Sequence, residues 1–377
     1  MVRMVRPAGV AAGFVVSLLL LNSGCQKGRS GAARPKVETP STEATPAAQA
    51  QAGAPTIGTP ETVMPEAQKE RAAVLEPNEA GAPVELALKF AAGQVGVYKI
   101  TTEAQKSVEW MGAPAAKPAN FKDGRTGNHI EMTFEQRVRE VHEDGGATVE
   151  ITIRALKYVG ESQSNVVLDF DSARDKDPTH PLAKLIGKSY RLHVSAKGQV
   201  LALIDVEPVR QAVKSDLPAG GTALKLLSDE EIKGRHEIPP LSALKDAEVR
   251  PGQTWSNIKS FSFGMMGAKS YERVYTLKHA GQKDGLAIVE MKAIPSSAMA
   301  EQIHKQEAGG LFSRMFDNIE NYEGRLELDR KSGSIREYVE QMQTEWVMAD
   351  PAGEQEGGRP AALKMAARQL LRLEQVP

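Results

Sequence analysis

The sequence has little cysteine, little surplus charge and no long apolar run. Its 377 residues contain a single cysteine, Cys25, so no disulfide bond can form within the chain. Lys and Arg total 47 against 48 for Asp and Glu, and this balance argues against a nucleic-acid binder, which usually carries a basic excess. The other proportions, 41% apolar and 25% charged residues, are typical of a globular protein with one large or two modest domains.

Sequence motifs of common enzyme classes are also missing. The chain has no G-x-S-x-G elbow, no P-loop, no G-x-G-x-x-G and no H-E-x-x-H. The seven histidines lack the spacing of metal ligands; they are His129, His142, His180, His193, His236, His279 and His304. We therefore expect no catalytic residue, no cofactor and no metal site.

The N-terminus has the features of an export signal. Arg3 and Arg6 precede the apolar run Ala8–Leu21, which is too short for a membrane span of about 20 residues. The stretch LNSGC that ends at Cys25 resembles a bacterial lipobox, although Asn22 stands where that motif usually has leucine. The resemblance implies cleavage before Cys25, attachment of a diacylglyceryl group to its thiol through a thioether, with palmitate among the acyl chains, and anchoring to the cell envelope.

The residue after the cysteine bears on which membrane holds the anchor. It is Gln26, and the lipoprotein pattern associates inner-membrane retention with an aspartate at this place. The outer membrane is therefore expected, where the cell has one. The alternative is an ordinary secretory signal with an unrelated cysteine.

Residues 25–83 differ in composition from the rest of the chain. They are rich in Ala, Pro, Thr, Glu and Gln and contain few large aliphatic residues. Such a segment cannot bury enough apolar surface to offset the entropy lost on ordering. It is predicted to be a disordered linker with a root-mean-square reach of roughly 40 Å.

Alternating strands dominate the sequence after the linker. In the predicted hairpin 130–158, Met132, Phe134 and Val138 share one face while charged residues occupy the other. The turn at Glu143–Gly146 has the Asp-Gly-Gly pattern of a hairpin. One apolar and one polar face predict an antiparallel sheet that is packed on one side.

The pattern of these strands occurs twice. GKSYRLHVSAKGQVLALIDV (187–206) and GRLELDRKSGSIREYV (324–339) both alternate around a polar turn that ends in glycine. FAAGQVGVY (90–98) and VRPGQTW (249–255) share a turn glycine, a glutamine and a following strand. The sequence therefore predicts a mainly β, α+β fold: a duplicated antiparallel meander that forms a curved sheet or half-barrel with helices packed on it.

The sequence pattern predicts that the chain is divided into five parts. They are a signal peptide at 1–24, a lipid-anchored linker at 25–83, a first β-unit with a helical insertion at 84–248, a second β-unit at 249–350, and a loop with a C-terminal helix at 351–377. Helices in the insertion are expected at 207–214 and 221–233. The C-terminal helix is expected at Ala361–Glu374, where Leu and Ala recur at helical spacing.

One apolar group suggests a ligand site. FSFGMMG contains Phe261, Phe263, Met265 and Met266, and Met adapts to irregular ligands. Filling of the core at a strand end explains the same residues equally well.

Two groups of carboxylates are candidates for a cation site or a catalytic site. Asp169, Asp171, Asp175 and Asp177 form the densest one, but a solvated loop with Phe170 anchored in the core explains it better than a cation site or a hydrolase. Glu131 and Glu135 are explained by cross-strand charge pairing.

The stretch LSALKDAEVRPGQTW (241–255), with LDFDS and the two closing hairpins, resembles a family of uncharacterised bacterial lipoproteins classed as a domain of unknown function. The resemblance covers about Val84–Asp350 and implies no activity or cofactor. The expected architecture is also similar to that of envelope lipoprotein carriers.

These features favour a non-catalytic envelope lipoprotein that binds an envelope protein or an apolar ligand. The alternatives are a lipid or lipoprotein carrier with an apolar cavity and a carboxylate-dependent hydrolase.

Overall fold

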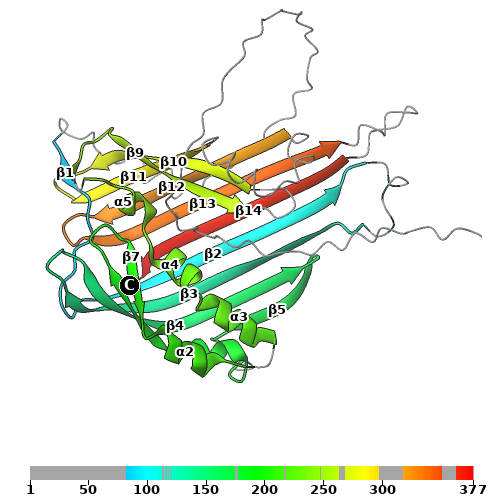
Figure 1. The fold of residues 1–377 in the computed structure, drawn as a ribbon, viewed down its shortest axis with the longest axis horizontal. Coiled ribbons are helices and arrows are strands. Elements are labelled where there is room, and N and C mark those ends of the chain that lie inside the picture. The colour runs from blue at the N-terminus through cyan, green and yellow to red at the C-terminus, as the bar shows by residue number, and fades with distance from the viewer. Residues whose placement is uncertain are drawn as a thin grey trace, which may run out of the picture. The chain divides into compact units, whose positions relative to one another are not determined.

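The computed structural model describes residues 82–112, 114, 117, 119, 121–174, 177–215, 218–246, 248–262, 268–296, 317–349 and 362–376. Within them the chain forms a 12-stranded antiparallel sheet in the order β7-β6-β4-β3-β2-β14-β13-β12-β11-β10-β9, with β5 paired to β4. The strands β7 and β9 are its edges, so the sheet is open (Figure 1). The predicted mainly β fold with a large antiparallel sheet is confirmed.

The strands fall into two consecutive sets, here called the first and the second repeat. The first repeat consists of β1 (Val84–Glu85), β2 (Val95–Trp110), β3 (Gly124–Val141), β4 (Ala147–Ser162), β5 (Asn165–Asp171), β6 (Ser189–Val194) and β7 (Val200–Ile204). The second repeat consists of β8 (Glu248–Val249), β9 (Thr254–Ser262), β10 (Ala268–Ala280), β11 (Leu286–Pro295), β12 (Asp317–Asp329) and β13 (Ser334–Ala349).

The predicted Gly-Gln turns are built alike in the two repeats. Gly93 and Gly252 have φ values of 81° and 84°, a conformation that favours glycine. The Gly93 N–H donates to the Val138 carbonyl on β3 at 2.9 Å, and the Gly252 N–H donates to the Leu277 carbonyl on β10 at 2.7 Å. The following glutamines, Gln94 and Gln253, each use their side-chain oxygen to accept a backbone N–H at 3.1 Å.

Irregularities of the ladders are repeated as well. The β3–β4 hairpin and the β10–β11 hairpin both shift register just after the residue that contacts the Gly-Gln turn. The closing hairpins β6–β7 and β12–β13 shift at matching places, after His193 and after Glu327. The first strands of the two repeats pair with each other, with Val84 opposite Val249. Bulges are specific local features, so their recurrence supports the predicted duplication.

The C-terminal segment corrects the prediction of a helix at Ala361–Glu374. It forms strand β14 (Ala362–Val376), which lies between β13 and β2 and joins the two repeats. Helix propensity contributes only tenths of a kcal/mol per residue, whereas both edges of this strand are paired. Apolar and polar residues also alternate along it: buried Ala367 precedes exposed Arg368, and buried Leu373 follows exposed Arg372.

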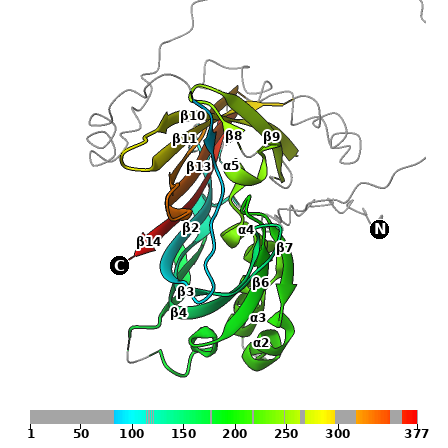
Figure 2. The same cartoon turned by 90° about the vertical axis from the view of Figure 1, so that its left-hand side faces the viewer.

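Helices cover one face of the sheet, which we call the inner face. They are η2 (Pro181–Leu185), α2 (Val206–Val213), α3 (Pro218–Leu226), α4 (Asp229–His236) and α5 (Pro239–Ser242). Figure 2 shows them on a single side of the strands, with the sheet curving around that side. The predicted helix 207–214 corresponds to α2, whereas the one predicted at 221–233 is divided, because Ser228 accepts the Glu231 N–H at 3.3 Å and begins α4.

The core lies between these helices and the inner face. Val209 and Val213 of α2 are buried, and α2 packs against β6 while α4 packs against β7. Within the described part of the chain, no helix is long and apolar enough to cross a membrane.

Candidate functional site

A cavity of about 210 Å³ lies where both repeats and β14 meet. Its apolar wall includes Tyr98, Phe134, Val138, Leu192, Ile335 and Leu373. The side chains of Gln94, Gln136, Gln375, Ser332 and Ser334 add uncharged polar groups to the lining. Among the described lining residues, Lys89 carries a permanent charge, and its Nζ donates to the Arg330 carbonyl at 2.8 Å.

His236 is the buried polar group of this cavity. Its side chain is 9% exposed, and Nε2 is 3.0 Å from the hydroxyl of Tyr190. The imidazole meets the Phe134 ring edge-on at 4.9 Å, and Phe134 stacks on Tyr98 at 5.8 Å. Burial, together with the charge of Arg235, lowers the pKa of His236 to about 3. The imidazole is therefore neutral at physiological pH and contributes hydrogen bonding without charge.

The second repeat carries a buried group of charges on its inner face, here called the Glu340 cluster. Glu340 accepts hydrogen bonds from Lys259 Nζ at 2.9 Å, from Arg273 Nη1 at 3.2 Å, and from the hydroxyls of Tyr322 and Tyr338. Burial raises the pKa of the Glu340 carboxyl, but Lys259 and Arg273 outweigh burial and hold this pKa below its usual range. Glu340 is thus an ionised carboxylate saturated with donors, which suits it to hold side chains in place rather than to transfer protons.

The Glu340 cluster also shows how strongly the second repeat curves. Lys259 lies on β9 and Glu340 on β13, which are four strand positions apart in the sheet. In a flat sheet, four spacings of about 4.8 Å would separate the two backbones by about 19 Å. The direct contact between the two side chains therefore requires the sheet to curve. The cluster stabilises this curvature through contacts on the inner face.

The predicted apolar ligand contacts are only partly described. Phe261 is 4% exposed on β9, where its ring packs edge-on against Tyr271 at 5.8 Å and Tyr322 at 5.6 Å. Phe263, Met265 and Met266 lie outside the described residues, as does Cys25. A ligand role for the FSFGMMG group and acylation of Cys25 stay predictions.

The carboxylates of the 169–177 loop are used to fold that loop. Arg174 pairs with Asp169 at 2.9 Å and with Asp177 at 2.7 Å. Asp177 also accepts the Asp171 N–H at 3.0 Å, and Phe170 is fully buried, as the sequence predicts. Asp175 lies outside the described residues.

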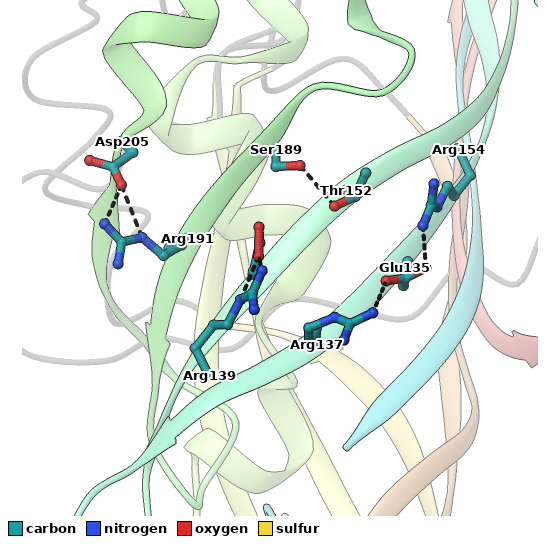
Figure 3. Close-up of polar contacts among 9 residues, drawn as sticks. Glu135, Arg137, Arg139, Thr152, Arg154, Ser189, Arg191 and Asp205 are labelled. Carbon is teal, nitrogen blue, oxygen red and sulfur yellow. Dashed lines mark hydrogen bonds and ion pairs between the residues drawn. The ribbon is translucent and has the colours of Figure 1, made fainter. Parts of the chain in front are cut away.

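The outer face of the first repeat carries paired charges (Figure 3). Glu135 accepts from Arg137 at 3.3 Å and from Arg154 on the neighbouring strand. Farther along, Arg139 pairs with Glu150, Arg191 pairs with Asp205, and the Thr152 and Ser189 hydroxyls are 2.8 Å apart.

Glu131 lies on the same face. It pairs with Lys99 at 2.7 Å, and the hydrogen bond from Lys99 lowers the pKa of Glu131 to about 2. The prediction that Glu131 and Glu135 make cross-strand pairs is confirmed. Across the described residues, no three His, Cys, Asp or Glu side chains are grouped so as to hold a metal ion.

Sequence reasoning missed the Glu340 cluster and the cavity. Lys259, Arg273 and Glu340 are far apart in the sequence, and each occurs within an alternating strand. The signal that was present is their placement: each occupies a position of the alternation where a core-facing apolar residue is expected.

Comparison with known proteins places the chain in a family. A solved structure of lipid–protein interactions in lipovitellin aligns with a TM-score of 0.35 and 14% identity, over 77% of this chain and 26% of that one. The chain thus spans about a quarter of the lipovitellin chain. No curated protein matches significantly. The sequence pattern of DUF6263, a family of unknown function, matches residues 144–335, just over half of the chain, so the protein belongs to this family.

Proposed function

We propose that the protein is an exported lipoprotein, anchored to the cell envelope through Cys25, whose sheet domain binds a small uncharged molecule without changing it chemically. The observation that carries the proposal is the cavity between the repeats. Its apolar wall suits a hydrocarbon or ring, and the glutamine and serine side chains suit hydroxyl or amide groups of a ligand.

The titratable groups of the cavity favour binding over catalysis. His236 is tied to Tyr190 and has a strongly lowered pKa, and Lys89 donates to a backbone carbonyl. A general acid or base needs a pKa near the working pH. The volume of about 210 Å³ is below the roughly 300 Å³ at which pockets for drug-sized ligands begin, so the ligand is small or inserts one end.

The anchor supports an envelope location. Cys25 and the preceding apolar run form the lipobox-like signal, and Gln26 favours the outer membrane where there is one. The membrane, reached through the acylated cysteine, is then the first partner, and the cavity ligand or an envelope protein that carries it is the second.

A lipid carrier is the second candidate. It is favoured by apolar side chains on the inner face of β14 and β2 that are only half-buried, namely Met365, Leu371 and Val108. A carrier would hold a diacyl lipid along this face, whereas the cavity holds a single small molecule.

Native mass spectrometry of the full-length protein, extracted from its membrane, tests the proposal. We expect one co-purified small molecule in the wild type and none in Val138→Phe, which fills the cavity. Val141→Phe is the matched control, because Val141 lies on the same strand but is 40% exposed. Ser334→Phe provides a second filling variant should Val138→Phe fail to fold.

The same spectra examine the anchor and the alternatives. Acyl groups on Cys25 add mass that Cys25→Ser lacks. A diacyl lipid lost in neither filling variant would favour the carrier. Retention of the same small molecule in both filling variants, or its turnover by the purified protein, would contradict binding in the cavity.

A further inference from the structure

The two cations of the Glu340 cluster occupy positions that are apolar in the first repeat. The shared Gly-Gln turns align Val138 with Leu277, and the strand registers extend this alignment along the strands. Arg273 then corresponds to Phe134, Lys259 to Ile100 and Asn257 to Tyr98. The pair Tyr98–Phe134 and the pair Asn257–Arg273 are opposite each other in the two ladders. The same backbone is thus built with an apolar core in one repeat and with buried charges in the other.

Buried charges are a poor way to stabilise this backbone. The free energy that two buried ions gain by attracting each other is largely offset by the cost of removing both from water. Well-packed apolar residues of similar volume are often as stabilising. The first repeat shows that apolar residues fit the positions of Lys259 and Arg273, which Ile100 and Phe134 fill there. The side chains of Arg273 and Glu340 are 8% and 7% exposed, so both ions are largely withdrawn from solvent. Their presence calls for a role besides stability.

The two cations of the cluster have hydrogen-bonding capacity left over. Arg273 donates from Nε to Asn257 and from Nη1 to Glu340, and among the described residues its Nη2 has no hydrogen-bond partner. Lys259 has three donors, one of which reaches Glu340, and its side chain is 34% exposed. Glu340 holds both cations in place and has no capacity left to neutralise the second positive charge.

The carboxyl group of Glu237 lies within electrostatic range of both cations. Glu237, in the connection between α4 and α5, forms no ion pair with Lys259 or Arg273 among the described residues. Its burial raises its pKa, while the charges of Arg273, Lys233 and Lys259 oppose that rise. A carboxyl group that approaches two cations without pairing is a competitor for any other anion that enters.

We propose that Lys259 and Arg273, positioned by Glu340 on the inner face of the second repeat, bind the oxyanion of a carboxylate or phosphate ligand. Arg273 contributes Nη2 and Lys259 its free Nζ donors, and charge-assisted hydrogen bonds of this kind are about twice as strong as neutral ones. None of the residues of the Glu340 cluster lines the cavity between the repeats, whose described lining suits an uncharged molecule.

Titration calorimetry on the full-length protein tests the site with three probes: inorganic phosphate, decanoate and the uncharged decanol. We expect saturable binding of phosphate or decanoate and none of decanol at this site. Decanoate bound more tightly than phosphate would identify an anionic amphiphile as the ligand class, whereas equal affinity would show that the oxyanion alone is recognised.

Variants locate the binding. Lys259→Met is expected to raise the Kd at least tenfold, and Lys259→Arg to leave it within about threefold. Lys99→Met is the matched control, because Lys99 is also 34% exposed and also pairs with a glutamate, Glu131. Glu237→Gln is expected to lower the Kd severalfold, since it removes the competing carboxyl group, and a purely structural role of Lys259 would not produce this gain.

Thermal unfolding of each variant shows whether it is folded under the conditions of the titration. Should Lys259→Met be unfolded, Glu237→Gln and Lys259→Arg still decide the question. Absence of binding by both anions, or an unchanged Kd in folded Lys259→Met, would overturn the proposal. Neither result would affect binding of a neutral ligand in the cavity.

Discussion

The two repeats share a backbone and differ in what they bury. Both place a positive-φ glycine and a glutamine before the second strand and both shift register at matching places. The first repeat then packs Tyr98 and Phe134 under its helices, whereas the second buries Arg273 and Glu340. Turn geometry and bulges set the backbone and were kept in both copies, while the inner-face side chains were free to diverge.

The largest expected effect separates the two kinds of core. Glu340→Ala leaves Lys259 and Arg273 without their shared carboxylate, and we expect a loss of about 3–5 kcal/mol in the free energy of unfolding. Urea denaturation measures this loss. The control gives the second repeat the residues of the first: Lys259→Ile and Arg273→Phe, combined with Glu340→Gln to keep an acceptor for the tyrosine hydroxyls.

This triple variant should lose less stability than Glu340→Ala alone, since no buried charge remains unpaired. A triple variant that is less stable than Glu340→Ala would show that the fold of the second repeat requires the charges. The apolar residues of the first repeat could then not replace them.

Acid should weaken the first repeat before the second. The pKa of His236 is lowered to about 3 in the folded protein, against about 6.5 in an unfolded chain. Below pH 6.5 the histidine binds a proton in the unfolded chain but stays neutral in the folded protein. The free energy of unfolding therefore falls as the pH falls, by about 2 kcal/mol between pH 6.5 and 5. Carboxylates with lowered pKa values, such as Glu131 and Glu340, add their own losses only below about pH 4.5.

Urea denaturation at pH 6.5 and at pH 5 measures this effect. Replacing His236 and Tyr190 together by Phe removes both the titrating group and its partner, and the double variant should lose little stability over the same interval. An equal loss in the wild type and in the double variant would assign the acid sensitivity to other groups.

The smallest effect examines the shared turns. Gly93→Ala and Gly252→Ala add a methyl group where no atom lies within 4 Å, so each loss reflects the φ of 81° or 84° alone. We expect about 1 kcal/mol from each, equal within error by thermal unfolding. Gly234→Ala is the control: it also meets no atom within 4 Å but lies in α4, where alanine is favoured. A clear difference between Gly93→Ala and Gly252→Ala would break the equivalence of the turns.

Local patterns predicted most of this architecture. The alternation around Met132 and Phe134 identified a strand with one buried face, and the Gly-Gln pairs near residues 93 and 252 revealed the duplication. These features follow from the local chain: the period of side chains in a strand and the conformational freedom of glycine.

The errors and omissions arose where distant residues decide the structure. In β14, the spacing of Leu and Ala is typical of a helix, and pairing with β13 and β2 overrides it. The Glu340 cluster depends on the curl of the sheet, because Lys259 and Glu340 meet across four strand positions. Nothing within either strand indicates that contact, so a reading of separate segments could not find it.

The position of β14 has a consequence for the order in which the sheet is assembled. Residues 362–376 come after all the other described strands in the sequence, yet they form the strand that lies between β13 and β2. A chain synthesised from its N-terminus presents both repeats before it presents the segment that joins them. Until that segment arrives, β2 and β13 each expose an unpaired edge, and such edges invite association with other chains. Pairing of β14 covers both edges in one step, and until that step is complete the two repeats are open to association with other chains.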